Sequence, residues 1–214
     1  MSDPSFFQEI QEDLERQKLE ALWKKYGFWI IVLALGLVIA TASATTFRSW
    51  KASHNQKVTA AFLTTMRASP TAAETLKALN TFADEHRGAD QAAMALLRAG
   101  SVALAQGDVQ TAVGFFDRVE KDAGFDSALR QLGALFSVQA QLDQEDPALL
   151  ASRLDPLIEA NMPWRFTAKE TYAYVALRNG EREKAKAFFQ EIVQDPEAPP
   201  SLAARVSDIL HAWD

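Results

Sequence analysis

The chain has 214 residues, of which 48% are hydrophobic, so it is long enough for one folded domain of ordinary size and a short additional segment. The 28 Asp and Glu residues outnumber the 22 Lys and Arg residues, and the net charge of −6 excludes a broad basic surface for nucleic acid. The sequence contains no cysteine, which excludes disulfides, cysteine-ligated zinc and thiol chemistry.

Residues 1–25 predict an amphipathic helical tail. Asp3 is a suitable N-cap and Pro4 suits the first helical position. Apolar residues then follow at helical spacing: Phe7, Ile10, Leu14 and Ala21. Two interpretations remain open for this apolar face, a helix lying near a lipid surface and a docking site for a partner, and we favour the first.

Residues 26–47 predict a single transmembrane helix. The segment from 28 to 46 carries no charge over 19 residues, and crossing the hydrocarbon core takes about 20. Basic residues flank it on both sides, together with interfacial aromatics such as Trp23, Trp29 and Trp50. The alternative of a buried core helix is disfavoured, because such helices rarely lack charge for five turns.

A cleaved signal peptide is the second alternative for this segment, since Ala42, Ser43 and Ala44 form an A-x-A pattern. The 27 residues before the apolar run include six acidic ones, whereas a secretory n-region is short and basic, so we favour an uncleaved anchor. Charge barely favours a cytoplasmic N-terminus, with four basic residues before the span and three soon after it. Gly36, Ala40 and Ala44 share one face on which another helix could approach.

Residues 48–214 predict a helical repeat domain, because Ala-rich amphipathic stretches alternate with short polar breaks. The segment Gly107-Asp108, followed by Ala112 and the pair Phe115-Phe116, recurs 73 residues later as Gly180-Glu181, Ala185 and Phe188-Phe189. Stepping back 34 residues from each alanine gives Ala78 and Ala151, so we propose four units. The third unit is degenerate, with Asp155 where an aromatic residue is expected.

Each unit predicts a helix pair in which the small residue allows close approach and the aromatic residue one turn later fills the gap. Gly107 and Gly180 suit the left-handed backbone at a helix C-terminus, and Asp108 suits the cap of the next helix. A last helix, from about 200 to 213, is expected to cover the open end. The expected pairs are 54–69 with 71–87, 89–106 with 108–123, 126–143 with 147–160, and 164–179 with 181–194.

This pattern resembles the tetratricopeptide repeat, which places Gly at the turn between helices, then Ala and an aromatic residue four positions on. Gly100 falls at the motif's helix-A glycine, and Asp195-Pro196 lies near its closing proline. The tryptophan and tyrosine of helix A are missing from the second unit, which leaves the number of repeats open.

The order of parts resembles one family, the YfgM-type proteins that are ancillary subunits of the SecYEG translocon in the bacterial inner membrane. The resemblance rests on LWKKYG (residues 22–27), the single span, MPWRFTAKE (162–170) and DPEAPPSLAAR near the end. It implies a cytoplasmic tail (1–25), a periplasmic repeat domain (48–214), and association with the translocon, periplasmic chaperones and newly exported chains.

The sequence predicts no enzyme. His54, His86 and His211 stand far apart, without metal-ligand spacing, and no phosphate loop or nucleophile elbow is present in the sequence. We interpret the pairs Phe115-Phe116 and Phe188-Phe189 as core rather than as a ligand box. Pro163-Trp164-Arg165 is interpreted as a helix start that packs on its neighbour.

We therefore expect an all-α, tetratricopeptide-like α-solenoid behind one transmembrane helix, which binds segments of other proteins. First helices supply most binding surface in such folds, so those at 54–69, 89–106 and 126–143 are the candidates. We assign no individual catalytic, cofactor-binding, metal or partner-binding residue. Three rival interpretations remain: an oligomerisation module joined through Gly36, Ala40 and Ala44, a cytoplasm-facing scaffold, and an enzyme of unknown type.

Overall fold

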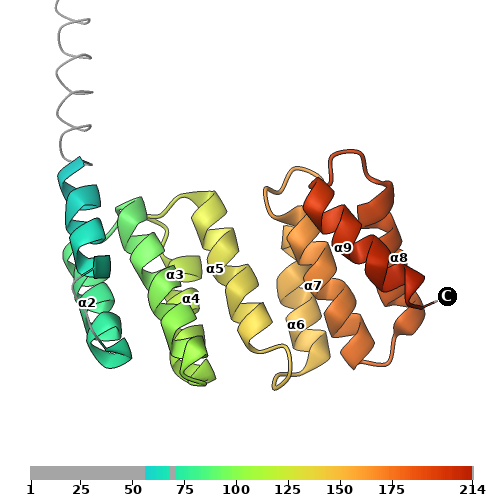
Figure 1. The fold of residues 1–214 in the computed structure, drawn as a ribbon, viewed down its shortest axis with the longest axis horizontal. Helices are drawn as coiled ribbons and strands as arrows, with labels where there is room; N and C mark the ends of the chain where they lie inside the picture. Colours follow the sequence, from blue (N-terminus) through green and yellow to red (C-terminus); the bar gives the residue numbers. More distant parts are fainter. Residues whose placement is uncertain (1–55, 68–70, 214) are drawn as a thin grey trace, which may run out of the picture. The chain divides into compact units, whose positions relative to one another are not determined.

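The computed structural model describes residues 56–67 and 71–213, and every regular element in these residues is helical (Figure 1). Val58–Asp214 forms one compact unit. A helix spans 56–67, and it is followed by α2 (Ala72–Glu85), α3 (Asp90–Ala105), α4 (Val109–Lys121), α5 (Ser127–Ala140), α6 (Pro147–Leu154), the 3-10 turn η1 (Asp155–Leu157), α7 (Arg165–Arg178), α8 (Arg182–Gln194) and α9 (Pro200–His211). This is the all-α arrangement of consecutive helix pairs that the sequence predicts.

From residue 71 onward the predicted helix boundaries agree with the structure to within about three residues, with one exception, and the ends predicted at 54 and 69 lie outside the described residues. The helix expected at 147–160 ends at Leu154 and continues only as η1. Pro156 explains the difference, because proline has no backbone N–H for the helical ladder and its ring clashes with the carbonyl one turn before it. The prediction that this helix extends to 160 was therefore wrong.

Glycines end the first helices of the second and fourth pairs, as predicted. Gly107 and Gly180 have φ angles of 78° and 79°, which L-residues with side chains rarely adopt. The amide of Gly107 donates to the carbonyl of Leu104, and the next amide, of Asp108, donates to Ala103, which is the Schellman pattern. The Asp108 carboxylate then accepts from the amide of Thr111 and caps α4.

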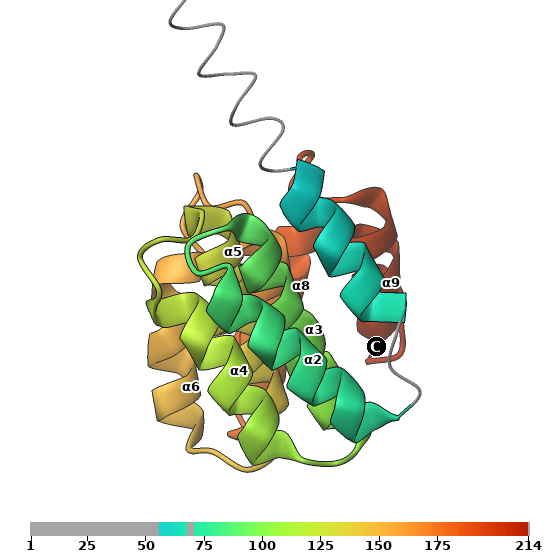
Figure 2. The ribbon, with the colours of Figure 1, turned by 90° about the vertical axis from the view of Figure 1, so that its left-hand side faces the viewer.

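The helices form two layers. Figure 2 shows α4 and α6 on one side of the unit, and the helix at 56–67 with α9 on the other. Polar contacts join neighbouring first helices: Gln91 Nε2 donates to Thr59 Oγ1 at 2.9 Å, and Gln139 Nε2 donates to Thr171 Oγ1 at 3.0 Å. In each of these two hydrogen bonds the donor and acceptor residues are 32 residues apart, about one repeat. The same kind of contact therefore recurs between first helices along the domain.

The repeat residues form the core between the layers. Ala112, Phe116, Ala185 and Phe189 are at most 1% exposed. Phe116 lies against Gly100, where an added methyl group would stand 2.6 Å from Phe116 Cζ. In the first and third units the corresponding alanines, Ala78 and Ala151, are only half-buried. In the third unit Leu154, one residue before the expected aromatic position, is fully buried instead.

Several predictions concern residues outside 56–67 and 71–213: the tail at 1–25, the transmembrane helix at 26–47, the stripe of Gly36, Ala40 and Ala44, and His54. Within the described ranges, no helix has the length and apolar character needed to cross a bilayer.

Candidate protein-interaction surface

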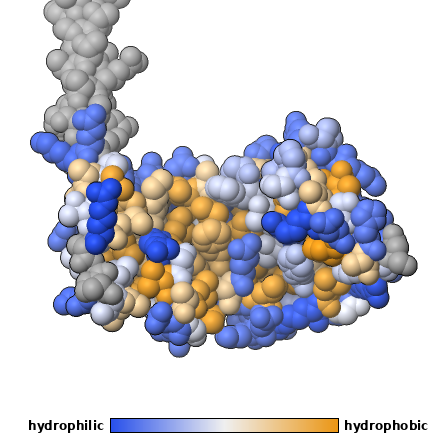
Figure 3. Space-filling model, viewed as in Figure 1, coloured by the Kyte–Doolittle hydropathy of each residue, from blue (hydrophilic) through white to orange (hydrophobic). Residues whose placement is uncertain are grey.

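Large apolar side chains are exposed on the helix at 56–67 and on α3, which are the first helices of the first two pairs. We call this group the apolar face: Leu63 (45% exposed), Met66 (43%), Met94 (47%) and Leu104 (37%). Two further large apolar residues in the described part of the chain are similarly exposed, one each on α6 and α8. Figure 3 shows apolar residues gathered over α3 and α5 on the side where the first helices lie. Such clustering on one face of a folded domain indicates a binding surface.

The hydrogen bond between Thr59 and Gln91 aligns the two helices that carry the apolar face. Leu63 follows Thr59 by four residues and Met94 follows Gln91 by three, so each lies one helical turn beyond the bonded pair. The two exposed side chains therefore lie on the same edge of adjacent helices. Methionine adapts its shape readily to different partners, which suits recognition of varied apolar segments.

Arg98 adds a positive charge beside the apolar face. It lies one turn beyond Met94 on α3, is exposed, and forms no hydrogen bond or ion pair with another described residue. An arginine with its donors free is suited to a carboxylate, which it binds through two parallel hydrogen bonds. The surface therefore offers apolar contact and one anchor for an acidic group.

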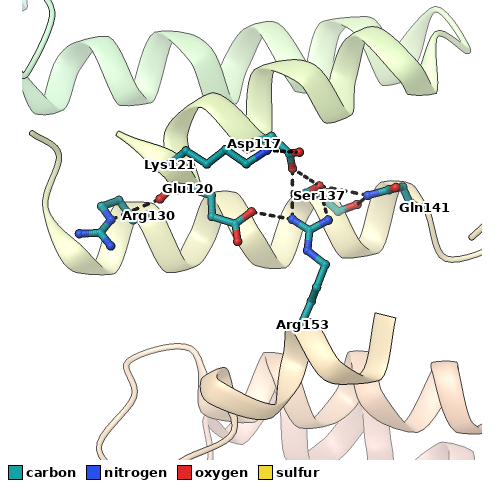
Figure 4. Close-up of polar contacts among 7 residues, drawn as sticks. All are labelled: Asp117, Glu120, Lys121, Arg130, Ser137, Gln141 and Arg153. Atoms are coloured by element: carbon teal, nitrogen blue, oxygen red, sulfur yellow. Dashed lines mark hydrogen bonds and ion pairs between the residues drawn. The ribbon is translucent and has the colours of Figure 1, made fainter. Parts of the chain in front are cut away.

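A polar cluster fixes α4, α5 and α6 to one another (Figure 4). Ser137 is fully buried and its hydroxyl donates to Asp117 Oδ1 at 2.6 Å. Arg153 reaches across from α6 and donates to Asp117 at 3.1 Å and to Glu120 at 2.6 Å. Burial alone raises the pKa of Asp117, but hydrogen bonds from Ser137, Lys121 and Arg153 outweigh it, so this pKa lies below its ordinary value. The cluster joins the second and third pairs.

A second polar contact joins α7 to α9. Glu170 is 6% exposed, and its two oxygens accept from Arg205 at 3.0 and 2.8 Å. Burial and the neighbouring Glu170 raise the pKa of Tyr174 above its ordinary value. Because the buried carboxylate is held in a bidentate pair, we interpret it as structural.

The two histidines within the described ranges lie at helix ends, and the pair Phe188-Phe189 packs inside the fold. His86 ends α2 and packs on Phe82, with ring centroids 4.5 Å apart, and His211 is exposed at the end of α9. Phe189 is fully buried, and the ring of Phe188 packs against Tyr172 at 4.6 Å. No group of three or more potential metal ligands occurs among the residues that the structure describes.

Trp164 precedes α7 and is half-buried, and its indole N–H donates to the carbonyl of Ala128 at 2.7 Å. The structure thus gives this residue the packing role on the neighbouring pair that the sequence favours, and its polar atom is satisfied within the fold.

Sequence reasoning missed the residues of the apolar face and the polar contacts between pairs. A signal for the first existed: Leu63, Met94 and Leu104 are large apolar residues on candidate binding helices, outside the repeat's alanine and aromatic positions. The polar contacts left a weaker trace in charged residues spaced about one repeat apart, such as Asp117 and Arg153.

The helix pairs, the glycine turns and the buried alanine and phenylalanine of each well-formed unit agree with a comparison of sequence families. The profile of the tetratricopeptide repeat-like domain matches residues 20–207. The chain belongs to the tetratricopeptide repeat-like domain family. No curated protein and no solved structure matches it. Tetratricopeptide repeat-like domains are scaffolds for protein–protein interaction and are typically not catalytic, so the chain's partners are expected to be proteins.

Proposed function

We propose that the chain is a membrane-tethered scaffold whose apolar face binds segments of other proteins, as an ancillary subunit of the Sec translocon. The observation that carries the binding role is the group of exposed side chains on adjacent first helices: Leu63, Met66, Met94 and Leu104. Covering exposed apolar side chains with a partner favours binding by about 25 cal/mol per Å² of apolar surface removed from water.

The chemistry of the face defines the kind of segment that it binds. Methionine and leucine on neighbouring helices suit apolar side chains presented by an extended or helical segment. Arg98, one turn beyond Met94, suits an acidic side chain or a terminal carboxylate of the same segment. Newly exported chains and chaperones that handle them supply such segments, which agrees with a role beside a translocon.

The membrane tether and its orientation are supported by the sequence. The uncharged run at 28–46 supports one transmembrane helix, and the resemblance to YfgM-type proteins supports an N-terminal tail in the cytoplasm and a repeat domain in the periplasm. In this arrangement the domain lies on the side of the inner membrane where exported chains emerge.

A single cysteine at Met94 tests both parts of the proposal, because the chain has no other cysteine. Met94→Cys is labelled in intact cells with a membrane-impermeant thiol reagent, and a thiol-attached photo-crosslinker then captures its neighbours for identification by mass spectrometry. Gln190→Cys, at an exposed position of the second-layer helix α8, is the matched control.

The proposal expects both cysteines to be labelled from outside and translocon subunits, chaperones or exported chains to be captured from Met94→Cys but not from Gln190→Cys. Protection of both cysteines in intact cells would contradict the periplasmic orientation and leave a cytoplasm-facing scaffold. Equal capture from the two positions would contradict binding through the apolar face.

A further inference from the structure

A groove lies at the open end of the first helix pair, on the side away from α3. It has a volume of about 640 Å³ and is lined mainly by small and apolar atoms from the helix at 56–67 and from α2. Its lining includes Ala61 and Thr65 from the first helix, and Ala78 and Thr81 from the second. We call this feature the end groove.

One helix pair later, the surface equivalent to the end groove lies inside the fold and is covered by a helix. Ala95 and Ala99 stand 34 residues beyond Ala61 and Thr65, and both are fully buried in the cluster where α2 packs on α3. Ala61 is exposed and Thr65 only half-buried. The equivalent surface one pair later is therefore covered by a helix, and small side chains at these positions allow a helix to approach closely.

The rim of the end groove shows which helix fits. Lys77, Thr81 and Glu85 lie at four-residue spacing along one row of α2. Lys77 and Glu85 are exposed, and neither has a hydrogen bond or ion pair with another described residue. They carry opposite charges at equal distances on either side of Thr81. A row of this kind is complementary to itself when a second copy lies antiparallel, with Thr81 at the centre.

We propose that the end groove is a two-fold interface in which α2 of one chain packs antiparallel on α2 of a second copy. Thr81 lies at the two-fold axis, and Lys77 of each copy faces Glu85 of the other. Such an interface is isologous, so each ion pair occurs twice. The proposal goes beyond the scaffold function and does not depend on it, because the end groove lies away from the apolar face.

The geometry at the axis permits a direct test. Packed helices have axes about 8–10 Å apart and Cα atoms about 2.3 Å from each axis, which places facing Cα atoms about 3.4–5.4 Å apart, a range that overlaps the one for disulfides. Disulfides join residues with Cα atoms about 4.4–6.8 Å apart. A cysteine at Thr81 would therefore pair with its own copy, and the native chain contributes no competing cysteine.

The experiment measures disulfide-linked dimer of the full chain in its own membranes under mild oxidation. Thr81→Cys is expected to crosslink at least about tenfold more than Gln190→Cys, an exposed position on α8. Adding Lys77→Glu to Thr81→Cys places like charges opposite each other twice and is expected to lower the yield about threefold or more. Adding Glu85→Lys as well restores opposite charges and is expected to restore the yield.

These results separate a second copy from other occupants. If a different protein filled the end groove, Thr81→Cys would crosslink no more than the control, and the proposal would be overturned. Failure of the double charge reversal to restore the yield would equally overturn the antiparallel register. Far-UV circular dichroism of each variant confirms folding, which these exposed substitutions are expected to leave unchanged.

Discussion

Replacing Gly100 by alanine tests whether close approach of the paired helices determines this fold. An added methyl group at this position would lie 2.6 Å from Cζ and 2.8 Å from Cδ1 of Phe116, which is 1% exposed. Overpacking of this kind costs about 1–3 kcal/mol. Alanine is also the better helix former, which stabilises the helix by about 1 kcal/mol.

Gly114 is the matched control, because it lies inside α4 and an added methyl group there would have no neighbour within 4 Å. Gly114→Ala keeps the helix-propensity gain and adds no clash, so it is expected to stabilise the protein by about 1 kcal/mol. The propensity gain cancels in the comparison. Gly100→Ala is therefore expected to be about 1–3 kcal/mol less stable than Gly114→Ala.

The assay is thermal and urea unfolding of the full chain in detergent, followed by circular dichroism at the helix band. For a chain of this size each 1 kcal/mol shifts the midpoint by about 2–4 °C, so the two variants are expected to differ by about 2–12 °C. Equal stabilities, or a Gly100→Ala variant more stable than Gly114→Ala, would refute the argument that Phe116 packs directly on the glycine.

Three further outcomes are expected. Phe189→Ala, at a fully buried position, is expected to lower the free energy of unfolding in urea by about 3–5 kcal/mol. Phe188→Ala, at a half-buried position, is expected to lower it by about half as much, and the reverse order would make Phe188 the core residue. Arg153→Ala removes the ion pair of Glu120 and one of the three partners of Asp117, and it is expected to lower the free energy of unfolding by about 1–3 kcal/mol. An unchanged value would show that the cluster does not join the pairs. The pKa of Asp117 is lowered in the folded chain, so its charged form contributes stability above the ordinary carboxyl pKa of about 3.9. That stability is lost as the pH falls through the lower pKa of the folded chain, so Asp117→Asn is expected to lose less stability than the native chain between pH 6 and pH 3. Parallel pH profiles of stability for the two chains would contradict this.

The parts of the fold that sequence predicts are those determined by local chemistry. Gly107 and Gly180 adopt positive φ because the helix ends there and glycine has no Cβ to clash. Ala112 and Phe116 lie one turn apart on the buried face of a single helix, so periodicity alone places them in the core. The end of α6 was misjudged because the repeat pattern was extended through Pro156, which breaks the helix.

The sequence indicated the candidate binding helices but not which of their residues are exposed, because exposure depends on tertiary structure. Met94 and Leu97 are both large apolar residues on α3, yet Met94 is 47% exposed and Leu97 only 8%. The difference depends on which faces the neighbouring helices cover. In the same way, Arg153 has many acidic residues within reach along the sequence, and only the packing of α6 on α5 and α4 selects Asp117 and Glu120.

The most direct test of the account is the affinity of the full chain for the partner captured by crosslinking, measured for the native chain, Met94→Glu and Gln190→Glu. A carboxylate in the centre of the apolar face must lose its hydration when a partner covers it, so Met94→Glu is expected to weaken binding by about tenfold or more, equivalent to about 1.4 kcal/mol. The same change at Gln190 is expected to leave the affinity unaltered. Equal affinities for the native chain and Met94→Glu would contradict the claim that this protein binds through its first helices.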